Sequence, residues 1–198
     1  MNSCSDIIQT FSLYFGDETS LSSAEALALL QKKYNEVLMS EEWEFLKKVA
    51  TGSVSGTDIT QPTDFDRLTT DQQIYIGSGS QNFKVVPFTS RRMYENQRGF
   101  FYYDAKNEKF ISTQSLSDTY SFDYIYVPPA LDLVSSNPVF PIRFYDMLYH
   151  AMCIDADIIN MSDKARSYAK ENQMKYENFL NDMKSWNIKL SAFNTYGV

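Results

Sequence analysis

Residues 121–141 read SFDYIYVPPALDLVSSNPVFP, and they mark a change from one kind of secondary structure to another. Aromatic side chains recur at every second position from Phe122 to Tyr126, which is the period of a strand. The proline pair at 128–129 ends that strand. Pro141 has the fixed φ that suits the first turn of a helix. The stretch therefore predicts a β-rich block before it and a helical block after it.

Upstream of this stretch, the chain begins with helical patterns. Residues 6–15 have apolar side chains at helical spacing, and Ser22 with Glu25 forms the S-x-x-E capping box of a second helix. Ser40 resembles another helix cap and predicts a short third helix after it. Residues 51–60 are rich in Gly, Ser, Thr and Asp, and they predict a loop.

The middle of the chain alternates apolar and polar residues in the manner of strands. Residues 74–76 and 83–86 are separated by a glycine-containing turn, and residues 99–112 predict a hairpin. Asn107 is the natural residue for a positive φ in the turn of that hairpin. These short strands with close turns predict a small antiparallel sheet.

Downstream of Pro141, two long helices are predicted. The first runs to about Ile159, and the second begins after Ser162 with an apolar face that continues to Trp186. Residues 188–198 lack dense charge and show no helical period of any length, but they keep apolar and aromatic side chains. Tails that stay free in solution are usually charged and poor in aromatics. We therefore expect an extended tail that a partner binds through Leu190, Phe193, Tyr196 and Val198.

Together these patterns predict an α+β fold. A helical bundle is expected from residues 1–60 and 138–187, with the two long carboxy-terminal helices in its second part. Residues 61–137 are expected to form a β-rich insertion, and residues 188–198 the extended tail. A chain of 198 residues can bury enough surface to fold without a disulfide or a metal ion.

Composition and charge exclude several classes of protein. The net charge is −7, which is opposite in sign to what nucleic-acid binding by counterion release requires. The two cysteines, Cys4 and Cys153, lie far apart and suggest neither a zinc site nor a disulfide framework. The first residues do not resemble a signal peptide, and no apolar stretch is long enough for a membrane span.

Candidates for catalysis are weak. His150 follows Asp146 by one helical turn and could act as a general base, but no nucleophile motif accompanies it, so a half-buried structural histidine is favoured. Two pairs of neighbouring acids could serve glycoside or metal chemistry, but each is better explained as a solvated face: Asp64 with Asp66, and Asp155 with Asp157. The sequence predicts no catalytic residue, no metal site and no cofactor.

Aromatic residues are unusually frequent at 15% of the chain. Tyrosine suits contact surfaces, because its ring is rigid and its hydroxyl stays hydrated, although a β-rich core explains the same content equally well. An aromatic row that stacks on sugars is the basis of a rival hypothesis, a carbohydrate-binding module. As candidate interface residues we take six aromatic side chains of the β-rich block: Phe100, Phe101, Tyr102, Tyr103, Tyr124 and Tyr126.

The order of the motifs resembles a known family. Residues 42–45 read EWEF, residues 62–68 read PTDFDRL, and the strand at 122–129 ends in two prolines. The Pro-x-x-Pro segment at 138–141 and the YENFL segment at 176–180 follow in the helical block. Over roughly residues 24–183 this order resembles the head-to-tail adaptor, or connector, proteins of tailed bacteriophages.

The resemblance implies a structural virion protein and not an enzyme. It implies a closed ring of about twelve copies beneath the portal protein, a heterologous cyclic arrangement. The carboxy-terminal tail is then expected to pack on the portal, with tail or neck proteins below and DNA passing through without specific binding. The protein is expected at the head–tail junction of the virion, and in the host cytoplasm during assembly. Another neck or tail completion protein is the alternative.

Overall fold

The computed structural model describes residues 3–15, 21–77, 81–134, 136–160 and 163–196. The chain divides into two compact units. The helical unit comprises Met1–Phe45 and Pro129–Val198, and the β unit comprises Leu46–Pro128. The α+β class predicted from the sequence is confirmed. The β unit begins fifteen residues earlier and ends nine residues earlier than the β-rich insertion expected at 61–137.

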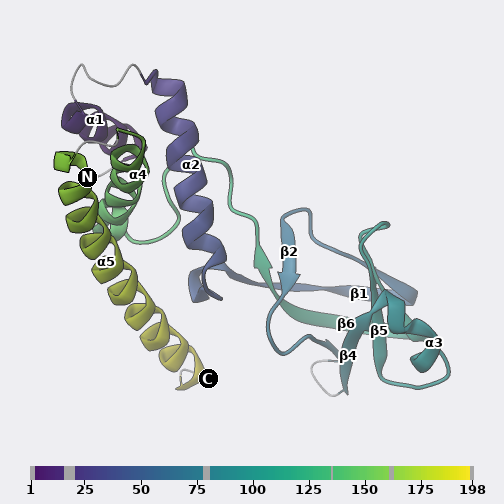
Figure 1. Cartoon of the computed structure of the whole chain (residues 1–198). Coiled ribbons are helices and arrows are strands. Elements are labelled where there is room, and N and C mark those ends of the chain that lie inside the picture. Colours follow the sequence, from purple (N-terminus) through teal and green to yellow (C-terminus); the bar gives the residue numbers. More distant parts are fainter. Residues whose placement is uncertain (1–2, 16–20, 78–80, 135, 161–162, 197–198) are drawn as a thin grey trace. The chain divides into compact units, whose positions relative to one another are not determined.

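Four α-helices build the helical unit (Figure 1). Their buried faces meet around α4, in which Met147, Leu148, Met152 and Cys153 are fully buried. This confirms the helices predicted at both ends of the chain. The helices are α1 (Cys4–Phe15), α2 (Ser23–Met39), α4 (Tyr145–Asn160) and α5 (Asp163–Tyr196), and a 3-10 turn, η4 (Ile142–Phe144), precedes α4.

The capping box at the start of α2 is present as predicted. The Ser22 hydroxyl oxygen accepts a 3.3 Å hydrogen bond from the backbone N–H of Glu25, and the Glu25 carboxylate accepts a 2.8 Å bond from the backbone N–H of Ser22. The bonds that the Glu25 carboxylate accepts from the Ser22 backbone N–H and from the Ser22 hydroxyl hold the pKa of this carboxyl below its usual range. Ser40 is the C-cap of α2 rather than the start of a further helix.

The segment after α2 differs from its prediction. A single 3-10 turn, η2 (Glu44–Leu46), replaces the expected third helix, and strand β1 (Lys47–Thr60) replaces the expected loop. The physical reason is pairing: β1 lies antiparallel along almost the whole of β6 (Lys109–Tyr126), whose hydrogen bonds outweigh the local preference of Gly and Ser for a loop. Gly52 has a packing role, since a Cβ there would lie 2.7 Å from the Tyr120 hydroxyl oxygen.

The β unit is a six-stranded sheet in which four strands close a small barrel. The barrel order is β6–β3–β4–β5 and back to β6, while β1 and β2 pair with β6 outside it. All pairings are antiparallel except β4 with β5, which are parallel because η3 (Phe88–Ser90) and α3 (Arg91–Tyr94) cross over between them. The remaining strands are β2 (Phe65–Leu68), β3 (Gln73–Ile76), β4 (Gln81–Pro87) and β5 (Phe100–Asp104).

The hairpin predicted at 99–112 is confirmed, since β5 pairs antiparallel with the start of β6. The positive φ of its turn falls on Glu108, at 53°, and not on Asn107. Asn107 instead donates a 2.8 Å hydrogen bond from its side chain to the Asp104 carboxylate. The apolar core of the β unit lies inside this closed sheet and contains Phe83, Phe101, Phe110 and Phe122.

The predicted extended tail is wrong in conformation, because α5 continues as a helix through Tyr196. The helix contains neither Gly nor Pro over its 34 residues, so nothing in its composition ends it before Gly197. Among the described residues, no helix is both long and apolar enough to cross a membrane.

Candidate functional site

The second half of α5 extends past the helix that it packs against. Helix α4 has 16 residues and α5 has 34, so at 1.5 Å per residue they span about 24 Å and about 51 Å. The two helices form an antiparallel hairpin, and Figure 1 shows that α5 continues past the N-terminal end of α4 toward the C-terminus of the chain. This part of α5 is therefore available for other contacts.

The first residues past α4 hold the segment that follows α2. The Asn187 side chain accepts a 2.7 Å hydrogen bond from the backbone N–H of Glu44 and donates a 3.1 Å bond to the carbonyl of Glu42. The Trp186 ring stacks on Phe45 at 5.9 Å, with 27° between the ring planes. Lys184 adds an ion pair of 2.6 Å to Glu41. Three residues of α5, Lys184, Trp186 and Asn187, thus fix residues 41–45.

The predicted tail residues occupy the end of α5. Leu190 is half-buried, while its neighbour Ile188 is 70% exposed. Phe193 and Tyr196 lie on the helix, but their side chains lie outside the described part of the structure, as does the whole of Val198. The α5 end, defined as residues 188–196, is therefore a helical element with at least one exposed apolar side chain.

The six candidate interface aromatics of the β unit separate into two groups. Phe101, Tyr102 and Tyr124 are buried in the unit itself, so their rings are not available to a sugar or to a neighbouring protein. Phe100, Tyr103 and Tyr126 are half-buried, and they remain candidates for an interface. Among the half-buried rings, Phe100 packs on Tyr94 at 4.5 Å. Burial of half of the set weakens the carbohydrate-binding alternative.

A polar network surrounds Tyr124 at the edge of the β unit. The Tyr124 hydroxyl donates a 2.9 Å hydrogen bond to the Asp64 carboxylate, which also accepts a 2.6 Å bond from Lys48. Burial, together with the bond to Asp64, raises the pKa of Tyr124 to about 12. The bond from Lys48 holds the pKa of Asp64 below its usual range. Asp64 is thus committed to this network, and its neighbour Asp66 pairs with Arg67.

His150 has a structural environment. Its Nδ1 lies 2.9 Å from the Asn172 side-chain oxygen, and its ring stacks on Phe179 at 6.0 Å. Asn172 is 5% exposed and donates a 3.4 Å hydrogen bond to the Tyr14 hydroxyl of α1. Burial lowers the pKa of His150. The histidine thus links α4 to α5, and a half-buried structural histidine remains the favoured interpretation.

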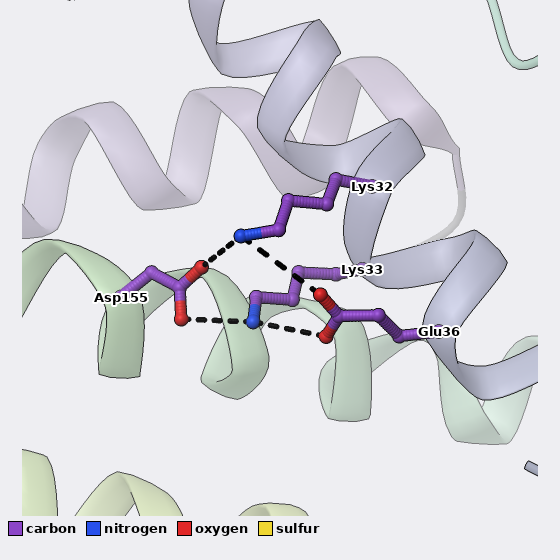
Figure 2. A network of polar contacts seen from close by, with 4 residues as sticks. All are labelled: Lys32, Lys33, Glu36 and Asp155. Carbon is purple, nitrogen blue, oxygen red and sulfur yellow. Dashed lines mark hydrogen bonds and ion pairs between the residues drawn. The ribbon is translucent and has the colours of Figure 1, made fainter.

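Of the second acidic pair, Asp155 and Asp157, the structure describes the side chain of Asp155 only. Asp155 on α4 makes ion pairs with Lys32 and Lys33 on α2 (Figure 2). Within the described ranges, no group of three or more His, Cys, Asp or Glu residues could hold a metal ion. Cys4 and Cys153 are both buried thiols outside any disulfide of the described residues, and burial raises the pKa of Cys4 to about 11.

Two cavities were not predicted from the sequence. One, of about 400 Å³, lies in the β unit among Phe65, Leu68, Val86 and Phe88. The other, of about 530 Å³, lies where η4 meets the second half of α5. The helical spacing of Phe179, Asp182, Trp186 and Lys189 places them on one face of α5, but no pattern in the sequence indicated that η4 would line the same cavity.

The comparison with family models identifies the chain. A search of curated proteins finds no match. One family model, described as SU10 adaptor protein, matches residues 2–193, which is nearly the whole chain and includes both units. Its proteins are structural adaptors and not enzymes. The chain therefore belongs to the SU10 adaptor protein family, and it is a bacteriophage head-to-tail adaptor and a structural component of the virion.

Proposed function

We propose that this adaptor forms a closed ring of about twelve copies between the portal protein and the tail, and that the α5 end docks on the portal. The observation that carries the proposal is the length of α5, which extends past α4 and presents Ile188 at 70% exposure. A virion adaptor joins other virion proteins, and a helix end with an exposed apolar side chain is a suitable element for that contact.

The predicted anchors keep their positions in this proposal, although the element is now a helix. Leu190, Phe193 and Tyr196 lie on the α5 end, and Val198 follows it. A preformed helix loses less conformational entropy on docking than an extended tail would, because its backbone is already ordered. The proposal therefore assigns the portal contact to a preformed helix and not to a flexible tail.

The charge of the chain supports a ring around passing DNA. The net charge of −7 opposes tight binding of a polyanion, so DNA can move through the ring without adhering to it. The half-buried Phe100, Tyr103 and Tyr126 are the β-unit residues that we assign to contacts with neighbouring subunits or with tail and neck proteins. We place the adaptor at the head–tail junction, after assembly in the host cytoplasm.

The proposal is tested by co-expressing the chain with the portal protein from its own genome and weighing the product by native mass spectrometry. We expect one discrete complex with equal numbers of both chains, which is lost when residues 188–198 are removed. A shorter deletion of residues 197 and 198 separates the contribution of Val198 from that of the helical anchors, because it leaves the whole of α5 in place. An adaptor that stays monomeric beside an intact portal ring would refute the proposal.

A further inference from the structure

The cavity between η4 and α5 is an apolar groove with an uncompensated positive rim. Its floor consists of Phe144, which is 4% exposed, and the half-buried Phe179 and Trp186. Arg143 lies over this floor, with its guanidinium carbon 4.8 Å from the Phe144 ring centroid and 5.5 Å from that of Trp186. Lys189 lines the cavity as well. The groove can therefore accept an apolar side chain next to a carboxylate.

The two cations of the groove have no carboxylate partner within the described residues. Neither Arg143 nor Lys189 has a carboxylate within 4.0 Å. The only acidic side chain in the lining is Asp182. The surroundings are otherwise strongly acidic, since the helical unit has sixteen acidic and nine basic side chains. Two cations without a carboxylate partner, beside half-buried aromatic rings in such a unit, favour an anionic occupant.

The same chain carries a segment with the complementary chemistry. Residues 13–25 contain three acidic side chains and no basic one. Leu13 at the end of α1 is 75% exposed, and Leu21 before α2 is 42% exposed. Glu25 is exposed, and its bonds to Ser22 use only one carboxylate oxygen, Oε2. An exposed leucine next to a carboxylate is what the groove requires.

One copy cannot join these two surfaces by itself. In the helical unit, α2 begins at the end where α5 also begins, as Figure 1 shows. The groove starts at Phe179, sixteen residues into α5, which is about 24 Å along the helix. A contact between the start of α2 and the groove must therefore join two copies head to tail. Such a heterologous contact can close into a ring.

We propose that the groove between η4 and α5 binds the start of α2 from a second copy of this chain, with Leu21 on the aromatic floor and Glu25 at Arg143 and Lys189. This inference rests on the proposed ring, because it names one of the contacts between its subunits. It shares only Lys189 with the α5 end, so variants and cross-links at Ser185 and Glu25, which lie outside that end, separate the subunit contact from the portal contact.

The first test is a cross-link from inside the groove. Ser185, an exposed residue of the lining, is replaced by a photo-cross-linking amino acid in the full chain, which is then co-assembled with the portal. We expect a covalent adaptor pair, with the second copy attached through a peptide within residues 13–25. Cross-linking to the portal alone, or to another part of the adaptor, would overturn the inference.

The second test uses matched charge reversals on α5. Lys189→Glu should raise the concentration needed for adaptor assembly by about tenfold or more, because a carboxylate then faces a carboxylate. Lys170→Glu has the same change of charge on an equally exposed lysine of α5, and it should leave assembly unchanged. Glu25→Gln keeps the capping box while removing the charge, so a weaker assembly there cannot be attributed to loss of the cap.

A mixture separates the contact from folding effects. Lys189→Glu and Glu25→Lys should each assemble poorly alone and should assemble together, since an alternating ring restores opposite charges at every contact. If wild-type chain assembles with the portal while all groove variants behave like wild type, the groove inference fails and the proposed function stands. If wild-type chain does not assemble with the portal, the proposed function fails, and the groove contact fails with it.

Discussion

The ammonium of Lys33 lies 2.8 Å from the Asp155 carboxylate and thereby ties α2 to α4 in the helical unit (Figure 2). The Lys33 side chain is only 12% exposed, and it also pairs with Glu36 at 3.0 Å. These interactions with Asp155 and Glu36 raise the pKa of Lys33, although burial opposes them, so the lysine stays charged. Lys32 reaches the same two carboxylates, but its side chain is 61% exposed.

This difference in exposure predicts different costs for two neighbouring lysines. Lys33→Met removes the better-shielded partner of Asp155, and we expect it to lower the free energy of unfolding by about 1–3 kcal/mol. Lys32→Met should cost about 0.5 kcal/mol or less, because exposed ion pairs contribute little. Urea unfolding of both variants measures the two values. Equal losses of unfolding free energy in the two variants would show that the lower exposure of Lys33 does not strengthen its ion pairs.

The amide of Asn187 predicts a second stability effect. Asn187→Ala loses the bonds to the backbone of Glu42 and Glu44, and we expect the free energy of unfolding to fall by about 1–2 kcal/mol. Asn178→Ala is the matched control, an exposed asparagine on the same helix, which should change stability by about 0.5 kcal/mol or less. A cost at Asn178 as large as at Asn187 would show that the two hydrogen bonds of Asn187 are not the cause of its effect.

How much of this structure the sequence predicted depends on the range of the interactions. The capping box of Ser22 and Glu25 is local, and its residues alone identified the start of α2. The strand β1 could not be identified in this way, because Gly52 and its neighbours become a strand only by pairing with β6. The groove also escaped prediction, since Arg143 reaches Trp186 across more than forty residues of sequence.

The exposure of the candidate interface aromatics also depends on long-range pairing and could not be predicted from the sequence. The aromatic run from Phe100 to Tyr103 predicted a strand correctly, but it did not indicate which rings would face the inside of a barrel. Closure of β5 onto β6 buries Phe101 and leaves Phe100 half-buried. The prediction of an extended tail was wrong for a related reason. The apolar residues near the end of the chain, such as Leu190, are too sparse to show a helical period, although α5 continues through them.

The bond between Tyr124 and Asp64 predicts sensitivity to alkali. The pKa of Tyr124 is about 12 in the folded chain and about 10 in an unfolded one, so the folded state keeps its proton longer. The stabilisation is fully present below about pH 10 and is lost as the pH rises toward 12, because only the unfolded chain ionises in that window.

Urea unfolding between about pH 8 and about pH 11 tests this expectation. Wild-type chain should lose more stability over that interval than Tyr124→Phe, which lacks the ionisable hydroxyl. The comparison uses the change with pH within each protein, so the bond that Tyr124→Phe loses at neutral pH does not affect it. Parallel pH profiles for the two proteins would contradict the raised pKa.

The helical conformation of the α5 end predicts how a proline acts there. Ala192 is exposed and lies past the residues of α5 that hold the segment 41–45. Ala192→Pro should break the last turns of the helix, since proline in a helix interior costs about 3 kcal/mol locally. The rest of the helical unit should keep its stability, because the broken part lies beyond Asn187 and its hydrogen bonds to Glu42 and Glu44.

Portal association then distinguishes a helix from an extended tail. If the portal recognises the α5 end as a helix, Ala192→Pro should weaken association by about tenfold or more, whereas Ala192→Ser should change it little. If the portal binds this segment as an extended chain, the proline should leave association unchanged or improve it, because an extended backbone accepts proline. Native mass spectrometry of the co-expressed proteins, with thermal unfolding of each free variant as the folding control, gives the answer.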